Sequence, residues 1–200
     1  MLLRKIKITM NKLAGVLSDK DLEDCLKKGY IEISPLYPNS IQPASVDLHL
    51  GDEFAIFDRR NNTMIDTKRS VVDMMKVYKG LSSFIVYPGE MVLAVTDELV
   101  SVPRDMVGRL EGKSSLARLG LSVHDAGYID PGNKLKITLE MSNQSGLPIK
   151  IYHKMPIAQI AFHTLTCDAA YPYGHKKLKS KYYQDKGVQV SQGHKNFNTK

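Results

Sequence analysis

Cysteine is scarce in this 200-residue sequence, which carries only Cys25 and Cys167. Two cysteines are too few for a disulfide framework or for a zinc site built on cysteine. No apolar run approaches the roughly 20 residues that a membrane-spanning helix needs. Residues 1–7 are basic, but no apolar block follows them, so they do not form a secretory signal. These absences predict a soluble, cytoplasmic protein without a membrane partner.

The motifs of several enzyme classes are also missing. None of the six histidines has a glutamate two residues later, and neither Cys-x-x-Cys nor His-Glu-x-x-His occurs, which excludes the usual zinc deaminase signature. Between Gly108 and Gly112 stand three residues, where a P-loop ahead of Lys113 requires four. The serine-hydrolase elbow fails because Leu116 replaces its second glycine.

Positive charge is concentrated near the C-terminus. The chain has a formal charge of +7, and seven lysines after Tyr171 against the single acid Asp185 leave +6 there and +1 before it. This segment is either a solvated tail or a segment that closes over a phosphate-rich ligand. Four tyrosines favour closure for residues 171–187, because disordered tails are poor in aromatics. Nucleic acid is disfavoured, since no strand face combines aromatic and basic residues.

Clear helical periodicity occurs near residue 20. Ser18 and Asp21 have the spacing of a capping box. Leu22 and Leu26 share one face, and Gly29 supplies a stop, so a helix is predicted between Ser18 and Gly29. A weaker helical pattern covers residues 71–78.

Short β-rich segments separated by turn residues fill the rest of the chain. Segments 84–87 and 91–96 flank Pro88-Gly89, which predicts a hairpin-type turn. A single domain is expected, mainly β, as an antiparallel barrel or sandwich with one N-terminal helix and few short helices. The predicted strands are 30–33, 46–50, 84–87, 91–96, 107–110, 136–141, 148–152 and 157–164.

Two carboxylates are candidates for chemistry. Asp130 precedes Pro131-Gly132, so it either caps a turn or serves a site. Strand alternation puts Glu140 on the opposite face from Leu139, where it either faces solvent or faces a pocket shared with Ser114 and Arg118. Lys113, Ser114 and Ser115 together form a cluster that can cradle phosphate oxygens in any fold.

Four segments, weak alone but specific in this order, resemble the dCTP deaminase family of the dUTPase superfamily: 42–51, 112–121, 126–140 and 181–187. The resemblance covers residues 16–190, which are expected to form one domain. Residues 1–15 would be an N-terminal extension, of which 1–9 are expected to be poorly ordered, and residues 191–200 would be a disordered tail. It implies a dUTPase-like distorted antiparallel β-barrel of β-clip or jelly-roll type. It also implies a homotrimer with active sites at subunit interfaces.

The resemblance implies zinc-independent deamination of dCTP. Glu140 would act as general base and acid for the water that attacks cytosine C4, a role that suits a partly buried carboxylate. Ser114 and the Ala126 carbonyl would position this water, and Arg118 would hold Glu140.

The remaining residues would bind the nucleotide. Phosphates with bridging Mg²⁺ would contact Lys113, Ser114 and Ser115, and Arg118 would also bind substrate and stabilise developing charge. Asp130 would hold the sugar 3′-hydroxyl and Tyr128 would lie under the sugar. The closing segment would contribute its own contacts through Tyr173, Lys181, Gln184 and Asp185.

Two products are possible within the family, dUTP alone or dUMP with pyrophosphate. The sequence around Asp130 resembles that of the dUMP-forming members, while a plain dUTPase or a weakly catalytic regulator remains an alternative. Five positions depart from the family pattern, namely Lys113 for Arg, Asn133 for an aromatic residue, Leu135 and Lys154 for Gly, and Asp185 for Gln. The Asp185 departure leaves a modified cytosine nucleotide or a monophosphate open as substrate.

Overall fold

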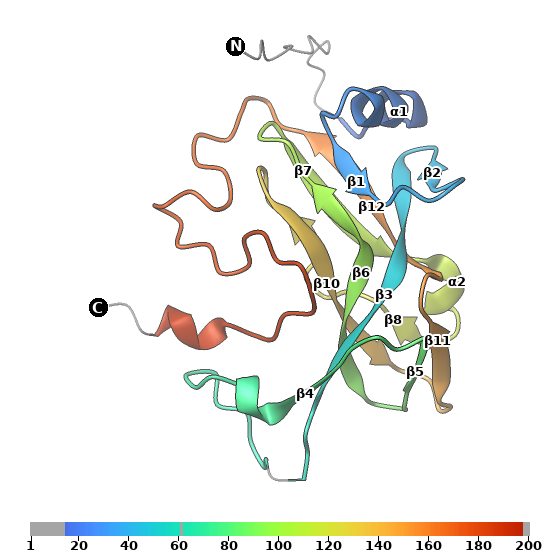
Figure 1. Cartoon of the computed structure of the whole chain (residues 1–200), viewed down its shortest axis with the longest axis vertical. Coiled ribbons are helices and arrows are strands. Elements are labelled where there is room, and N and C mark those ends of the chain that lie inside the picture. The colour runs from blue at the N-terminus through green and yellow to red at the C-terminus, as the bar shows by residue number, and fades with distance from the viewer. Residues whose placement is uncertain (1–14, 61, 198–200) are drawn as a thin grey trace.

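Antiparallel strands dominate the structure, a computed structural model that describes residues 15–60 and 62–197 (Figure 1). Ten strands of the described chain share one sheet, and β5 and β11 form a separate pair. The strands are β1 (Glu32–Ser34), β2 (Ile41–Gln42), β3 (Ser45–Phe57), β4 (Met75–Tyr78), β5 (Ser83–Val86), β6 (Met91–Ser101), β7 (Met106–Gly112), β8 (Leu121–Ser122), β9 (Tyr128–Ile129), β10 (Lys134–Asn143), β11 (Ile149–Tyr152) and β12 (Pro156–Thr164).

The predicted N-terminal helix is α1 (Asp19–Lys27), and its capping box is confirmed. The Asp21 backbone N–H donates to Ser18 Oγ, and the Ser18 N–H donates to the Asp21 carboxylate. Leu22 is fully buried, and Gly29 has φ of +66°, the conformation that favours glycine after a helix. The other helices are η1 (Val72–Met74), α2 (Ser114–Ala117) and η2 (Gly193–Asn196). Of the described residues, no helix is long and apolar enough to cross a membrane.

The large sheet curls so far that one short connection joins its two ends. Its main path runs β8-β10-β6-β3-β12-β7-β9, so β8 and β9 lie at opposite ends. These two strands are neighbours in sequence, joined only by residues 123–127. Five residues span at most about 18 Å, so the sheet must bend round to let β8 pair with β10 and β9 with β7. This closure accounts for the barrel-like shape and confirms the mainly β, antiparallel fold.

The core lies on the face of β10 that the alternation predicted. Ile137, Leu139 and Met141 are buried, while Thr138 and Glu140 point to the other face and are half-buried. The buried set extends through β3, β6 and β12 to Leu22 of α1. The packing of the core therefore leaves the face of β10 that carries Thr138 and Glu140 available for a binding or catalytic site.

Two local predictions were wrong. Residues 71–78 contain only the short η1, and Met75–Tyr78 form β4, which pairs with the end of β3. Segments 84–87 and 91–96 do form strands, but they do not make a hairpin with each other. Instead β5 pairs with β11, and β6 pairs with β3, β10 and β1.

Leu135 and Lys154, which stand where the family has glycine, adopt different conformations. Leu135 lies inside β10, opposite Val100, rather than in a turn. Lys154 keeps a turn conformation with φ of +65°, and its N–H donates to the Leu50 carbonyl at 2.8 Å. Residues 1–9 lie outside the described residues. Within the segment expected to be a disordered tail, residues 193–196 form η2.

Candidate active site

A cavity of about 440 Å³ opens beside the polar face of β10. Thr138 and Glu140 line it, and Asp130 lies at its rim after β9. Six of the predicted site residues line this one cavity: Ala126, Tyr128, Asp130, Glu140, Tyr173 and Asp185. These residues come from β10, from the segment 126–130 and from the C-terminal segment, so three stretches of the chain converge here.

Glu140 is held next to the loop that closes the sheet. Its Oε2 accepts a hydrogen bond from the Asp125 N–H at 3.4 Å. The loop itself is fixed by Gly127, whose carbonyl accepts from the Leu110 N–H at 2.7 Å. A Cβ on Gly127 would stand 2.4 Å from the Leu110 carbonyl oxygen, so no other residue fits there without moving backbone. The loop that joins the two ends of the sheet therefore also sets where Ala126 lies on the cavity that Glu140 lines.

Asp130 joins this cavity to a second one of about 400 Å³. Lys181 and Tyr171 line the second cavity, and Asp130, Tyr173 and Tyr182 line both. Burial raises the pKa of the Asp130 carboxyl above its usual value of 3.8. A carboxyl with a raised pKa at the junction of two cavities can accept a proton or bind a hydroxyl.

The C-terminal segment lines both cavities. In Figure 1 it is the long loop, orange to red, beside the sheet. Tyr182 N–H donates to the Tyr173 hydroxyl at 3.2 Å, which ties two parts of the segment together. Lys181 bonds to Asn196 of η2. The Asp185 carbonyl accepts from the Lys136 N–H of β10 at 2.8 Å, and burial raises the pKa of the Asp185 side chain. Gln184 is exposed and lines neither cavity.

The predicted phosphate cluster lies elsewhere on this chain. Lys113 and Ser114 line a third cavity of about 400 Å³, with Glu111 and His124. Lys113 Nζ is 2.6 Å from an Asp47 carboxylate oxygen, so its charge is balanced within the chain. The short helix α2 lies across the sheet from the C-terminal segment (Figure 1).

Ser115 and Arg118, at and just after α2, are exposed and line neither of the cavities beside β10. A pocket that holds Glu140, Ser114 and Arg118 together therefore does not form within one chain. Their exposure leaves both side chains available to another molecule.

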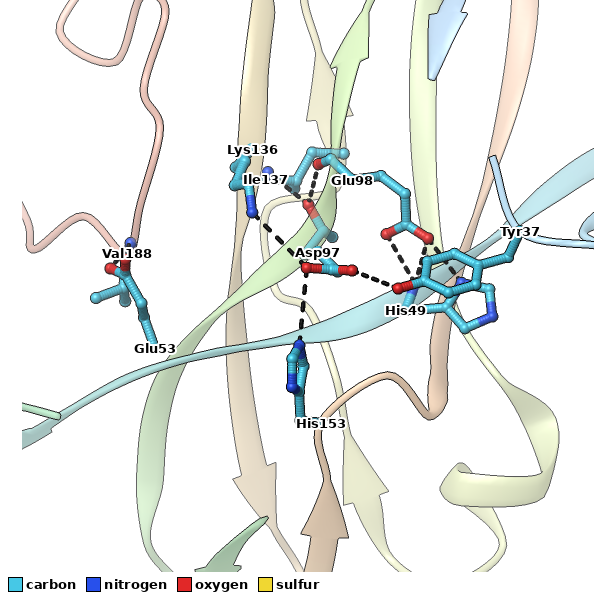
Figure 2. A network of polar contacts seen from close by, with 10 residues as sticks. Tyr37, His49, Glu53, Asp97, Glu98, Lys136, Ile137, His153 and Val188 are labelled. Atoms are coloured by element: carbon cyan, nitrogen blue, oxygen red, sulfur yellow. Dashed lines mark hydrogen bonds and ion pairs between the residues drawn. The ribbon is translucent and has the colours of Figure 1, made fainter. Parts of the chain in front are cut away.

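A buried polar network supports β10 from the next strand (Figure 2). The register between β10 and β6 shifts between Lys136 and Thr138, which leaves the Ile137 N–H outside the ladder. The fully buried Thr96 hydroxyl accepts from this N–H at 2.9 Å and donates to the Glu98 carbonyl at 2.9 Å. Ile137 alone opposes Thr96, Asp97 and Glu98, so β6 carries the bulge while Thr138 and Glu140 keep the alternation of β10.

Glu98 itself is fully buried against His49 of β3 (Figure 2). The His49 backbone N–H lies 2.9 and 3.0 Å from the two carboxylate oxygens, and the ring Nδ1 lies 2.6 Å from one of them. Burial raises the pKa of Glu98, and the hydrogen bonds from His49 oppose that rise. Sequence reasoning did not identify this pair, because its two members lie 49 residues apart.

Comparison with known protein families adds an independent line of evidence. The family model described as dCTP deaminase-like matches residues 16–165. The chain is also 42% identical over 186 residues to the "dCTP deaminase, dUMP-forming" of Corynebacterium kroppenstedtii, across 91% of this chain and 99% of that protein. The chain belongs to the dCTP deaminase-like family. A protein with the same description from Methanobrevibacter smithii is 44% identical over 175 residues, covering 84% of this chain and 90% of its own length. The expected family is confirmed.

A solved structure supports the fold of this family member. The 2′-deoxycytidine 5′-triphosphate deaminase from Agrobacterium tumefaciens matches with a TM-score of 0.61 at 22% identity. The match covers 76% of this chain and 48% of that one, so the chain spans about half its length. At this identity the likeness concerns the fold, and it agrees with the curled antiparallel sheet.

The rest of the cavity wall was not predicted in this family member. Thr138 and Tyr182 supply hydroxyls, and alternation with Glu140 already indicated the side of Thr138. An apolar wall comes from Phe57, Val71, Met75, Met91 and Leu93. Within residues 15–60 and 62–197, no group of three or more His, Cys, Asp or Glu side chains could hold a metal ion.

Proposed function

We propose that the protein deaminates dCTP hydrolytically and then converts the product to dUMP and pyrophosphate. The observation that carries this proposal is the position of Glu140, half-buried on β10 and facing a cavity that also contains Asp130. Two carboxylates from separate elements can serve two proton-transfer steps in one site. The dUMP-forming relatives, at 42% and 44% identity over most of the chain, support the same activity.

In the first reaction, water adds to C4 of cytosine and transfers a proton to Glu140. Glu140 delivers that proton to the ring nitrogen N3, then takes the proton of the new C4 hydroxyl and passes it to the amino group. The bond from C4 to the amino nitrogen breaks, ammonia leaves, and the C4 oxygen becomes the carbonyl of uracil. The Ala126 carbonyl, on the same cavity as Glu140, would orient the water. The net change is dCTP plus water to dUTP plus ammonia.

In the second reaction, water attacks the α-phosphorus of dUTP and pyrophosphate leaves. Asp130 would hold the sugar 3′-hydroxyl and help to activate this water, while Tyr128 would lie under the sugar. Both residues line the cavity, and Tyr128 remains 64% exposed, which leaves its ring free to stack. Mg²⁺, bound through the triphosphate, would neutralise charge on the leaving pyrophosphate.

The phosphate contacts would come from a second copy of the chain in a homotrimer. Ser114 and Arg118 are exposed and do not line the cavity of Glu140 in one chain, so assembly would have to supply them to the cavity of a neighbour. Lys113 and Ser115 would then contact the phosphates, and Tyr173, Lys181, Gln184 and Asp185 would close the site. Light scattering on the purified protein tests this state, and a monomer at enzyme assay concentrations would refute it.

Incubation with dCTP and Mg²⁺, followed by separation of nucleotides, tests the reaction. We expect dUMP and pyrophosphate in equal amounts, with one ammonia for each dUMP. Accumulation of dUTP would indicate a deaminase without the second step. Turnover of dUTP without turnover of dCTP would refute the deaminase assignment, and so would the absence of any turnover. Because the substrate is a free deoxynucleotide, we place the activity in the cytoplasm.

A further inference from the structure

We infer that Glu53 of β3 is a positioning residue that holds the C-terminal segment against the nucleotide cavity. Glu53 lies outside every motif that the sequence analysis identified, and it does not line the cavity. Its carboxylate contacts the backbone of the segment just where that segment forms the cavity wall. The inference rests on the proposed function, since it assigns Glu53 a part in nucleotide binding.

Hydrogen bonds at three successive points attach the segment to the sheet. The Lys136 N–H donates to the Asp185 carbonyl at 2.8 Å, and the Gln189 N–H donates to Thr138 Oγ1 at 3.2 Å. Between these points, the Val188 N–H donates to Glu53 Oε2 at 3.2 Å (Figure 2). The first two bonds go to β10, whereas Glu53 reaches the segment from β3.

The sheet register explains how a β3 residue reaches this place. Thr138 of β10 pairs with Val95 of β6, and Phe54, the residue after Glu53, pairs with Ala94. Glu53 and Thr138 therefore lie close to one row across three strands. The register between β3 and β6 shifts between Leu50 and Phe54, and such a bulge turns the side chain out of the regular alternation.

Gly187 shows how closely the segment approaches this carboxylate. A Cβ built on Gly187 would stand 2.7 Å from Glu53 Oε2, which is closer than nonbonded atoms come. Its φ is not among the positive values, so alanine would strain the contact rather than the backbone. Glycine at 187 and the carboxylate at 53 thus form one contact, which we call the Glu53–Gly187 clip.

The clip acts on binding rather than on proton transfer. Asp185 and Gln189, which flank the clip, line the cavity, and Glu140 contacts neither clip residue through any hydrogen bond described here. Lys79 lies 3.2 Å from the same Glu53 oxygen and balances its charge. Loss of the clip should therefore weaken nucleotide binding and leave the chemical step nearly unchanged.

Limited trypsin digestion tests the clip without nucleotide. Lys186 is exposed and directly precedes Gly187, so release of the segment should speed cleavage after Lys186. We expect about tenfold faster cleavage in Glu53→Ala and in Gly187→Ala, which corresponds to the net contribution of one ordinary hydrogen bond. Glu53→Gln, which keeps an acceptor oxygen, should resemble the wild-type protein.

Steady-state kinetics with dCTP test the functional part. Glu53→Ala and Gly187→Ala should raise KM about tenfold and keep kcat within about twofold, whereas Glu53→Gln should stay close to wild type. Asp58→Asn is the matched control, because Asp58 follows β3 and pairs with Lys76 of β4 at 2.8 Å, just as Glu53 pairs with Lys79. Lys79→Gln removes the ion pair alone and should leave KM unchanged.

The outcomes separate the two proposals. Equal cleavage after Lys186 in wild type and Glu53→Ala would overturn the clip whatever the substrate is. Faster cleavage with an unchanged KM would overturn its role in binding, and a fall in kcat with constant KM would do the same. A wild-type protein that fails to turn over dCTP would refute the proposed function, while the digestion result would still decide whether the clip exists.

Discussion

The substitution Thr96→Val tests whether the bulge in β6, opposite Ile137 of β10, positions the catalytic face. Thr96 is fully buried, and valine has the same shape, so the substitution opens no cavity. Two hydrogen bonds are lost, one from the Ile137 N–H and one to the Glu98 carbonyl, each 2.9 Å long. A buried N–H without an acceptor, here that of Ile137, costs about 1–3 kcal/mol. Loss of the hydrogen bond that the Thr96 hydroxyl donates to the Glu98 carbonyl adds about 0.5–1.5 kcal/mol. The free energy of unfolding should therefore fall by about 2–4 kcal/mol.

Urea unfolding followed by circular dichroism measures this loss. With a typical slope of about 2 kcal/mol per molar urea, the midpoint should fall by about 1–2 M. Wild type and variant are compared at one protein concentration, because any association contributes to stability. Thr67→Val, which changes an exposed hydroxyl, serves as the control and should leave the midpoint unchanged.

The same variant tests the link from the bulge to chemistry. At temperatures where Thr96→Val remains folded, deamination of dCTP should slow by at least about tenfold, because small displacements of a catalytic group have large effects on rate. A midpoint within about 0.3 M of wild type, together with normal deamination, would refute the reasoning about both the hydrogen bonds and the bulge.

Three further expectations concern the carboxylates and the metal. Glu140→Gln should abolish deamination while dCTP still binds in equilibrium dialysis, and retained turnover would remove Glu140 from the mechanism. Because the Asp130 pKa is raised above 3.8, the native state holds this proton more tightly than the unfolded chain. The free energy of unfolding should then fall as pH rises from 3.8 through the raised pKa, and unfolding curves of Asp130→Asn should lack that part of the fall. Removal of Mg²⁺ should suppress pyrophosphate release measured by a coupled assay, whereas a zinc-selective chelator should change neither product.

Local sequence patterns predicted where the two candidate carboxylates, Glu140 and Asp130, lie. Once Ile137 and Leu139 are assigned to the core, a period of two leaves Glu140 on the other face, and the structure has it on a cavity. The turn signal at Pro131-Gly132 likewise indicated that Asp130 follows a strand end, and it follows β9. These inferences succeeded because each depends on a few consecutive residues.

Pairings between distant segments could not be read in the same way. The turn at Pro88-Gly89 was correctly recognised as a break between strands, but β5 has its partner in β11, some 60 residues later along the chain. At residues 75–78, spaced apolar side chains fitted a helix, and pairing with β3 decided for a strand. Local signals state where a strand ends, and the tertiary fold decides which strand lies beside it.

The sequence also does not show which of the motifs lie at the same cavity of one chain. Ser114 and Glu140 belong to motifs that the resemblance joins in one site, yet one chain holds them at separate cavities. The apolar wall of Phe57, Met75 and Met91 has no motif, because each of these residues reads as ordinary core. The Glu53 carboxylate was missed for a similar reason, since its partner is a backbone N–H that no side-chain pattern reveals.

The closure of the sheet has a consequence for solubility. Exposed strand edges invite other chains to add strands, which leads to aggregation. Here the main path of the sheet ends in β8 and β9, each only two residues long. The five-residue connection between them also brings Ala126 to the cavity that Glu140 lines. An insertion in residues 123–127 would loosen the hold on both short edge strands and disturb the site at the same time, so this loop should tolerate length changes poorly.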